Sequence, residues 1–133
     1  ESTLSDAGFL IWGNITHEYA EASMGYSSNL SWGSYQARGW NDPHLVSYME
    51  SHDEERMMFK NITWGNSLGE YDVTELNTAL QRSELATVFF LPIPGPKMMW
   101  QFGEMGYDFS INTCEDGTIE EGCRTSPKPI HWE

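Results

Sequence analysis

The chain has 133 residues, which is enough for one small domain with a core and too few for two ordinary domains. Its 20 acidic residues and 7 lysines and arginines give a formal net charge of −13. Nucleic-acid phosphates and anionic lipids would repel such a chain, and no apolar run approaches the roughly 18–20 residues of a membrane span. Neither nucleic acid nor a membrane is therefore an expected partner. The chain begins at Glu1 with no signal-peptide pattern, which predicts an internal or processed fragment.

Three short apolar runs predict three strands buried on both faces. They occupy residues 8–13, 45–50 and 97–102. A long stretch rich in Gly, Ser and Asn, residues 23–43, separates the first two runs. A loop of that length inside a compact domain is usually functional.

Helical spacing is clearest between the second and third runs. Asp72 and Glu75 resemble a capping box, apolar residues follow at helical intervals, and Pro92 ends the pattern, which predicts a helix over residues 73–90. A shorter helix is expected near residues 17–22. Strands that alternate with helices predict parallel βαβ units, in which the loops after the strands converge on one mouth.

The sharpest cluster of chemical groups directly follows the second strand. It is the run Glu-Ser-His-Asp-Glu-Glu-Arg at residues 50–56. An imidazole beside a carboxylate offers donors and acceptors to neighbouring sugar hydroxyls, whereas the alternative is a charged, solvated helix start. A metal site is less favoured because adjacent side chains at a strand end point in different directions, and no HExxH spacing is present. Nucleophile elbows, P-loops and dinucleotide-binding glycine patterns are absent.

Three tryptophans lie in polar, turn-like surroundings. Trp32, Trp40 and Trp64 have Asn, Gly or Ser neighbours, so they are candidates for stacking on a sugar ring. The alternative for each of them is that the ring pins down a long loop.

The two cysteines, Cys114 and Cys123, are separated by eight residues that include two glycines. We expect them to lie close enough to form a disulfide, with two unpaired thiols as the alternative. A disulfide would indicate an oxidising compartment, so secretion or the periplasm is slightly favoured over the cytoplasm.

Several segments together resemble the α-amylase superfamily, glycoside hydrolase family 13. Residues 48–56, YMESHDEER, resemble the seventh-strand motif of that family, an apolar strand ending in Asn-His-Asp. Residues 94–108, PGPKMMWQFGEMGYD, are similar to its eighth strand and the following loop, and residues 124–132, RTSPKPIHW, to the run-out of the barrel. Residues 10–14 fall where the sixth strand is expected. The matches occur in order and cover nearly the whole chain.

The resemblance implies an α/β fold, namely a partial (β/α)8 TIM barrel made of about the last three β/α units. Residues 1–133 would then be a fragment of the catalytic domain, with residues about 125–133 leading out of the barrel. A complete barrel takes about 250 residues, so this chain holds only part of one. An open piece of barrel exposes strand edges, so we expect the chain to pair with the remainder of the barrel or to self-associate.

The resemblance also implies roles for single residues. Asp53 corresponds to the third catalytic carboxylate, which stabilises the transition state, and His52, Arg56 and Glu104 are expected to contact substrate. Ser51 stands where the family usually has Asn. The nucleophilic Asp and the acid/base Glu of the family belong to motifs that would precede residue 8, and no such motif occurs in this chain.

The implied activity is that of a retaining hydrolase or transferase that acts on α-glucans. The chain alone is expected to be inactive and to hold neither a metal nor a cofactor. The resemblance leaves open whether a complete barrel binds a calcium ion elsewhere. The alternatives are a non-catalytic carbohydrate-binding module, which predicts an antiparallel sandwich, and an inactive amylase homologue. The presence or absence of the nucleophilic Asp and the acid/base Glu upstream would distinguish an enzyme from an inactive homologue.

Overall fold

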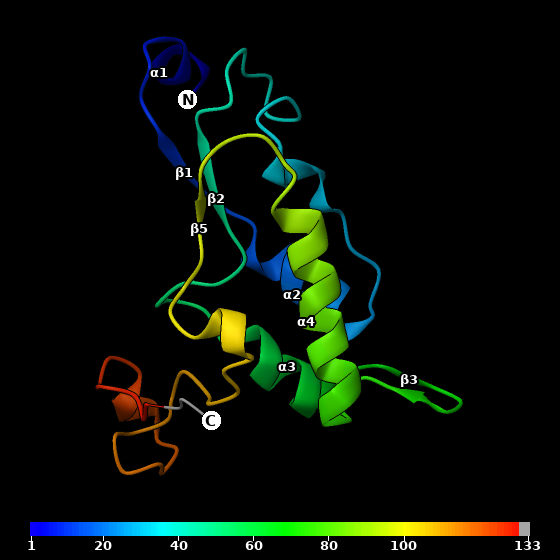
Figure 1. Ribbon diagram of the computed structural model, residues 1–133. Helices are drawn as coiled ribbons and strands as arrows, with labels where there is room; N and C mark the ends of the chain where they lie inside the picture. Colours follow the sequence, from blue (N-terminus) through cyan, green and yellow to red (C-terminus); the bar gives the residue numbers. More distant parts are fainter. Residues whose placement is uncertain (131–133) are drawn as a thin grey trace.

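The computed structural model describes residues 1–130 and shows a small parallel sheet with its longer helices grouped on one side of it (Figure 1). Residues 131–133, the end of the predicted exit segment 125–133, lie outside the described residues. The elements follow one another as α1 (Ser2–Asp6), β1 (Ile11–Asn14), α2 (Thr16–Met24), η1 (Leu30–Gly33), β2 (Leu45–Tyr48), α3 (Met57–Trp64), β3 (Ser67–Leu68), β4 (Tyr71–Asp72), α4 (Leu76–Phe90), β5 (Lys97–Met98), η2 (Gly103–Met105) and η3 (Glu121–Cys123).

The main sheet has the order β1-β2-β5, and both pairings are parallel. This arrangement confirms the prediction of three parallel strands, although each strand is shorter than its apolar run. The third run leaves the sheet after Met98 because the chain turns: the Gly103 N–H donates to the Trp100 carbonyl at 3.0 Å, and Phe102 adopts a left-handed φ of 65°. A barrel is not shown, since the described residues form three parallel strands beside a separate two-stranded hairpin.

The prediction of burial on both faces is wrong for the first and third strands. Both described residues of β5, Lys97 and Met98, are only half-buried. The side chain of Trp12 in β1 is 61% exposed, and the preceding Phe9 and Leu10 are also exposed. The physical reason is that β1 lies at the edge of the sheet, where it pairs only with β2 and has no helix over the face that carries Trp12. The ring of Tyr48 in β2 meets Trp12 edge-on, with 5.9 Å between the ring centroids.

The core lies between the sheet and the helices α2, α3 and α4, which pack against one another. Tyr19 of α2 and Phe90 of α4 are fully buried and meet edge-to-face, with 5.7 Å between ring centroids. Ile15, Met49, Met57 and Ala86 complete this cluster. The buried Asn61 of α3 donates to the Ser23 hydroxyl of α2 at 2.7 Å, which ties two of the helices together.

The predicted long helix exists, but it begins at Leu76 and not at residue 73. The predicted capping box is wrong, because Asp72 belongs to the preceding hairpin: its carboxylate accepts from the Ser67 hydroxyl at 2.6 Å and from the Thr74 N–H at 2.9 Å. Glu75 occupies the N-cap position without a side-chain hydrogen bond. The predicted short helix corresponds to α2, which extends over Thr16–Met24.

Helix α3 was not among the predicted elements, although a charged helix start was the alternative interpretation of the run at residues 50–56. Its first N–H group, that of Met57, donates to the Glu50 carboxylate at 2.6 Å. A carboxylate at a helix N-terminus satisfies an otherwise unpaired donor and complements the helix dipole. Glu50, the last residue of the second apolar run, therefore also caps the N-terminus of α3 through its carboxylate.

We expect Phe90→Ala to lower the free energy of unfolding by about 3–5 kcal/mol, because the substitution removes a fully buried ring and leaves a cavity. Phe89 is the matched control, since it is the neighbouring ring on the same helix and is 59% exposed. Phe89→Ala should change the free energy by less than about 0.5 kcal/mol. Urea unfolding followed by circular dichroism measures both values, and equal losses in the two variants would contradict the described core.

Candidate functional site

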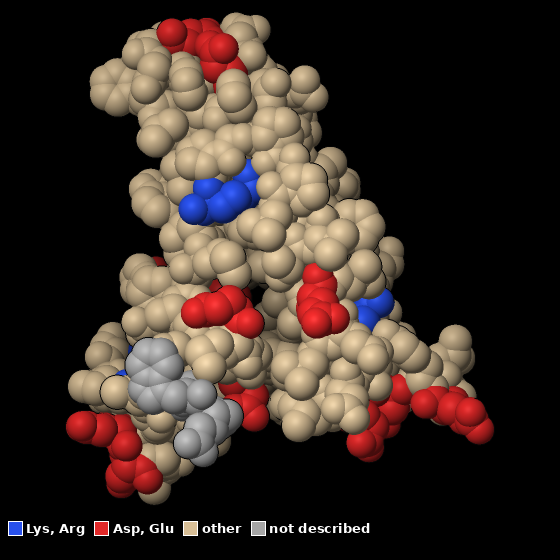
Figure 2. All heavy atoms as spheres, viewed as in Figure 1, with Lys and Arg blue, Asp and Glu red and all other residues tan. Residues whose placement is uncertain are grey.

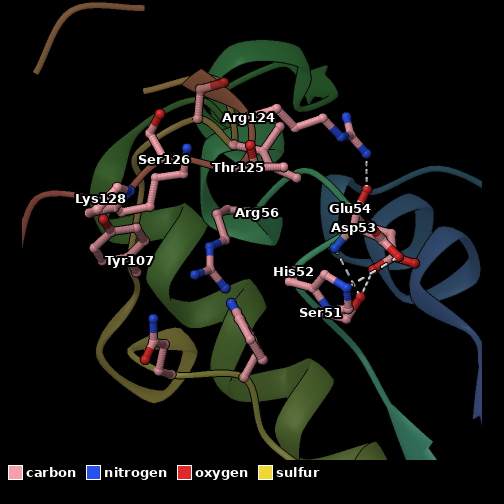
Figure 3. A pocket seen from close by; sticks show the side chains of 15 residues that line it. Ser51, His52, Asp53, Glu54, Arg56, Tyr107, Arg124, Thr125, Ser126 and Lys128 are labelled. Atoms are coloured by element: carbon pink, nitrogen blue, oxygen red, sulfur yellow. Dashed lines mark hydrogen bonds and ion pairs between the residues drawn. The ribbon is translucent and has the colours of Figure 1, made fainter. Parts of the chain in front are cut away.

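A hollow of about 290 Å³ lies at the edge of the sheet where the parallel strands end (Figure 3). Its lining comes from three parts of the chain: the loop after β2, the loop after β5 and the C-terminal segment 110–128. Figure 1 shows this C-terminal segment, in orange and red, beyond the carboxyl ends of the strands. We call this feature the edge hollow, and it is lined by Ser51, His52, Asp53, Glu54, Arg56, Trp100, Gln101, Tyr107, Ser110, Ile111, Arg124, Thr125, Ser126, Pro127 and Lys128.

His52 and Asp53 form the exposed side of the edge hollow. Their side chains are 71% and 70% exposed, and His52 Nε2 lies 3.5 Å from Asp53 Oδ2. The ring of Trp100, from the loop after β5, lies 5.8 Å from the His52 ring and is tilted against it. The pair thus presents an imidazole and a carboxylate to solvent, beside an aromatic ring, where a polar ligand can reach all three groups.

The loop that carries this pair is held by a hydrogen-bond network around Glu54. The Asn14 amide, at the end of β1, donates to one Glu54 oxygen at 2.6 Å, and the Ser51 hydroxyl donates to the other. The Asp53 N–H in turn donates to the Ser51 hydroxyl at 3.2 Å. The carboxyl ends of β1 and β2 are therefore joined through one carboxylate, which is how the fold sets the position of the Asp53 backbone.

Arg56, which lines the edge hollow, and Glu50, which does not, are both buried. The Arg56 side chain contacts two aromatic rings, with its guanidinium carbon 5.1 Å from the Tyr107 centroid and 5.8 Å from that of Trp100. Burial lowers the pKa of Arg56, and the nearby charge of Glu50 acts in the opposite direction. Burial raises the pKa of the Glu50 carboxyl, and the hydrogen bond from the Met57 N–H opposes that rise.

The C-terminal segment is tied to the site mainly through Glu55. Its carboxylate accepts from the Ile111 N–H at 2.7 Å and from the Ser110 hydroxyl at 2.8 Å. Further along, the Tyr107 hydroxyl donates to the Pro129 carbonyl at 2.6 Å, and Arg124 donates to the backbone carbonyl of Asp53. These bonds bring the end of the chain against the loop after β2.

The structure brings three of the four residues predicted as site residues to this edge of the sheet. Asp53, His52 and Arg56 line the edge hollow, whereas the exposed Glu104, in η2, does not. Glu104 is instead one of the groups whose charge raises the pKa of Glu50.

Sequence reasoning missed the wall formed by the C-terminal segment. The sequence predicted only a loop there. The contacts that hold this loop at the site join residues 53–55 to residues 110–124, which are far apart along the chain. The available signal was the presence of Arg124 and Lys128 in an otherwise acidic tail. Trp100 and Tyr107 were within the segment that resembles the amylase family, but no role was assigned to them.

The predicted disulfide is confirmed, since Cys114 and Cys123 are bonded with their Cα atoms 5.0 Å apart. The Lys128 ammonium donates to the Thr113 carbonyl at 2.9 Å and to the Cys123 carbonyl. The disulfide loop and the lysine therefore fold the C-terminal segment into one unit beside the edge hollow.

The three candidate tryptophans lie outside the edge hollow. Trp40 is buried, with 5% of its surface exposed, so it offers no face to a ligand. The Arg38 guanidinium lies 4.8 Å over the Trp32 ring, and Trp64 packs edge-on against Phe59. The Arg38 contact favours the interpretation that Trp32 pins down a loop, whereas Trp64 is the last residue of α3 and packs within that helix.

Searches with models of known protein families and against curated protein sequences found no match to this chain. Within residues 1–130, no three His, Cys, Asp or Glu side chains are grouped so that they could hold a metal ion. No helix in the described part of the chain is long and apolar enough to cross a membrane. The functional argument therefore depends on the residues of the edge hollow themselves.

We expect the buried Glu50 to make the protein less stable as the pH rises. Its folded-state pKa lies above the unfolded value, so its contribution to stability is fully present below the unfolded pKa and is lost as the pH rises through the folded pKa. Glu50→Gln, which retains an oxygen to accept from Met57, should therefore raise the free energy of unfolding relative to the parent chain above about pH 5 and leave it nearly unchanged near pH 4.

Urea unfolding at a series of pH values measures this difference. Glu70→Gln in the exposed β3–β4 hairpin is the matched control, because it removes the same charge without burial. A Glu50→Gln gain that does not depend on pH, or one that Glu70→Gln reproduces, would contradict the assigned burial effect.

Proposed function

We propose that this chain forms the last part of the catalytic barrel of an α-amylase-type glycoside hydrolase or transferase that acts on α-glucans by a retaining mechanism. On this proposal the sheet β1-β2-β5 provides the final three strands of the barrel. The first strands of the barrel, with the nucleophile and the acid/base, are supplied by residues outside this chain. The edge hollow is then one side of the substrate cleft.

The observation that carries the proposal is the position of His52 and Asp53. Both follow the central strand of a parallel sheet at its carboxyl end and line a hollow beside the Trp100 ring. In α/β barrels the catalytic groups come from this edge, because the loops after the strands converge there. The resemblance of residues 48–56 to the seventh-strand motif of the family agrees with that position.

On this proposal each residue has a chemical role. The Asp53 carboxylate is exposed, and its ion pair with His52 is exposed as well. The carboxylate can therefore stabilise the positive charge that develops on a sugar at the cleaved bond. The His52 imidazole is placed to hydrogen-bond a hydroxyl of the same sugar. The two groups that carry out bond cleavage in a retaining enzyme stand about 5–5.5 Å apart, and on this proposal they face Asp53 from the other strands.

The non-catalytic alternatives receive less support. A sandwich-type carbohydrate-binding module needs antiparallel strands, whereas the main sheet is parallel. An inactive amylase homologue would share every feature of this chain and differ only in the two carboxylates outside it. The disulfide favours an oxidising compartment for the protein, which agrees with secretion or the periplasm.

In a protein where this chain completes a barrel, we expect Asp53→Asn to lower kcat on starch about 10²–10³-fold while the melting temperature stays unchanged, because the lost group acts by electrostatics. Asp42→Asn is the matched control, since Asp42 is exposed and lies before β2, at the opposite edge of the sheet. Reducing-sugar release and circular dichroism give the two readouts. Full activity of Asp53→Asn would rule out the assigned role, and starch cleavage by the 133-residue chain alone would rule out the fragment proposal.

We expect the 133-residue chain alone to self-associate, because β1 leaves one strand edge unpaired and carries exposed apolar side chains. Light scattering should give a mass above the 15.2 kDa of one chain. Trp12→Lys should shift the population toward monomer, whereas Leu68→Lys, on the hairpin and equally apolar, should not. A monodisperse monomer of the parent chain would count against the barrel-fragment proposal.

A further inference from the structure

The fold gathers basic side chains at one place in a strongly acidic chain. The chain has only 7 lysines and arginines against 20 acidic residues, yet Arg56, Arg124 and Lys128 all line the edge hollow. Figure 2 shows acidic side chains distributed over several separate parts of the visible face, with few basic ones among them. The three cations come from segments about seventy residues apart in the sequence, so only the tertiary fold brings them together.

Arg56 is the cation that most needs a partner. Only 6% of its surface is exposed, and its Nη1 atom is buried without a hydrogen-bond partner among residues 1–130. Figure 3 shows its guanidinium in the middle of the edge hollow, between Tyr107 and His52. Burial lowers the pKa of Arg56 and the nearby charges of Glu50 and Glu55 oppose that shift, but neither carboxylate accepts a hydrogen bond from its Nη1 atom. An anion that enters the hollow would satisfy this buried donor.

The nearest carboxylates are committed to other donors. Glu50 accepts from the Met57 N–H, and Glu55 accepts from Ser110 and from the Ile111 N–H. Among the described residues no carboxylate lies within 4.0 Å of the Arg56 guanidinium as an ion pair; the ion pairs found there involve Arg38 and His52.

Arg124 and Lys128 provide further donors around Arg56. Each is anchored by backbone carbonyls, Arg124 by that of Asp53 and Lys128 by those of Thr113 and Cys123. Each still has N–H donors beyond those bonds. The hydroxyls of Thr125 and Ser126 lie on the same wall.

The edge hollow therefore has two chemically different sides. His52 and the carboxylate of Asp53 lie on one side and Lys128 lies on the other, while Arg124 reaches across to the backbone carbonyl of Asp53 (Figure 3). A neutral sugar suits the first side, and an oxyanion suits the second because a guanidinium binds phosphate oxygens through parallel hydrogen bonds. The volume of about 290 Å³ is close to the lower end of ligand pockets, about 300–1,000 Å³, which suits a single phosphorylated sugar unit.

From this arrangement we infer that the edge hollow is a phosphate-binding site, with Arg56 as its buried anchor and Arg124 and Lys128 as its outer contacts. The phosphate is a monoester on a sugar unit of the glucan. The sugar part of this ligand rests on the proposed function, whereas the phosphate part does not.

Isothermal titration calorimetry of the 133-residue protein with glucose 6-phosphate, inorganic phosphate and glucose tests the inference. Glucose 6-phosphate should bind at least about tenfold more tightly than glucose, and its affinity should fall as salt is added. Inorganic phosphate that binds as tightly as glucose 6-phosphate would support the phosphate site and overturn its sugar part. Equal affinities for glucose and glucose 6-phosphate would overturn the site.

Variants assign the binding to the named cations. Arg124→Gln replaces an exposed residue and should weaken glucose 6-phosphate binding about tenfold, as should Arg56→Lys, which keeps the charge but loses the forked donors. Lys60→Gln on α3 is the matched control, because it removes one positive charge outside the edge hollow and should leave the affinity unchanged. Unchanged affinity in both arginine variants would overturn the site.

The test of the phosphate site can fail independently of the test of the proposed function. Phosphate binding that depends on Arg124, together with no starch cleavage in the completed barrel, would contradict only the proposed function. Starch cleavage that depends on Asp53, together with no preference for the phosphorylated sugar, would contradict only the phosphate site.

Discussion

The Glu55 carboxylate is the interaction on which the candidate site depends. It accepts hydrogen bonds from the Ile111 N–H and the Ser110 hydroxyl, and so joins the loop after β2 to a segment more than fifty residues further along the chain. Together with the hydrogen bonds from Tyr107 to the Pro129 carbonyl and from Arg124 to the Asp53 carbonyl, this connection holds the C-terminal segment at the carboxyl edge of the sheet. That segment supplies one wall of the edge hollow, including Arg124 and Lys128. A charge-assisted hydrogen bond to backbone N–H is among the stronger contacts available for such a task.

Burial of the opposite charges of Glu50 and Arg56 gives the site its electrostatic character. The Glu50 carboxylate accepts from the first N–H group of helix α3, and Arg56, the N-cap residue of that helix, contacts the rings of Trp100 and Tyr107. Both groups lose solvation, which raises the pKa of Glu50 and lowers the pKa of Arg56. Groups of this kind are costly to keep in a core, and they are commonly found where a protein binds or transforms a ligand.

The exposed apolar side chains agree with the proposal that this chain is part of a larger barrel. Trp12 in β1 and Phe89 in α4 are more than half exposed, at an open edge of the sheet and on the outer helix. Large apolar side chains gathered at a sheet edge or on a helix face usually mark contact surfaces. In the proposed barrel these are the places where neighbouring strands and helices would pack, and in the chain alone they are the source of the expected self-association.

Local sequence patterns determined the elements that depend on neighbouring residues. The apolar runs that contain β1, β2 and β5, the helical spacing of α4 and the short separation of Cys114 and Cys123 were enough to predict parallel strands, a long helix and a disulfide. The exact strand ends and the capping box were not predicted correctly. The Asp72 carboxylate accepts from Ser67 and Thr74 in the hairpin, so it does not cap the helix that the sequence pattern predicted.

Only the tertiary structure decided which of the chemically capable residues share a site. His52, Asp53 and Arg56 could be identified because they directly follow an apolar strand, and strand order places such residues at one edge. Arg124 and Lys128 could not be placed, and the exposure of Trp12 could not be foreseen. These properties depend on contacts between segments far apart in the chain and on which faces remain uncovered, and neither is encoded in the periodicity of a single segment.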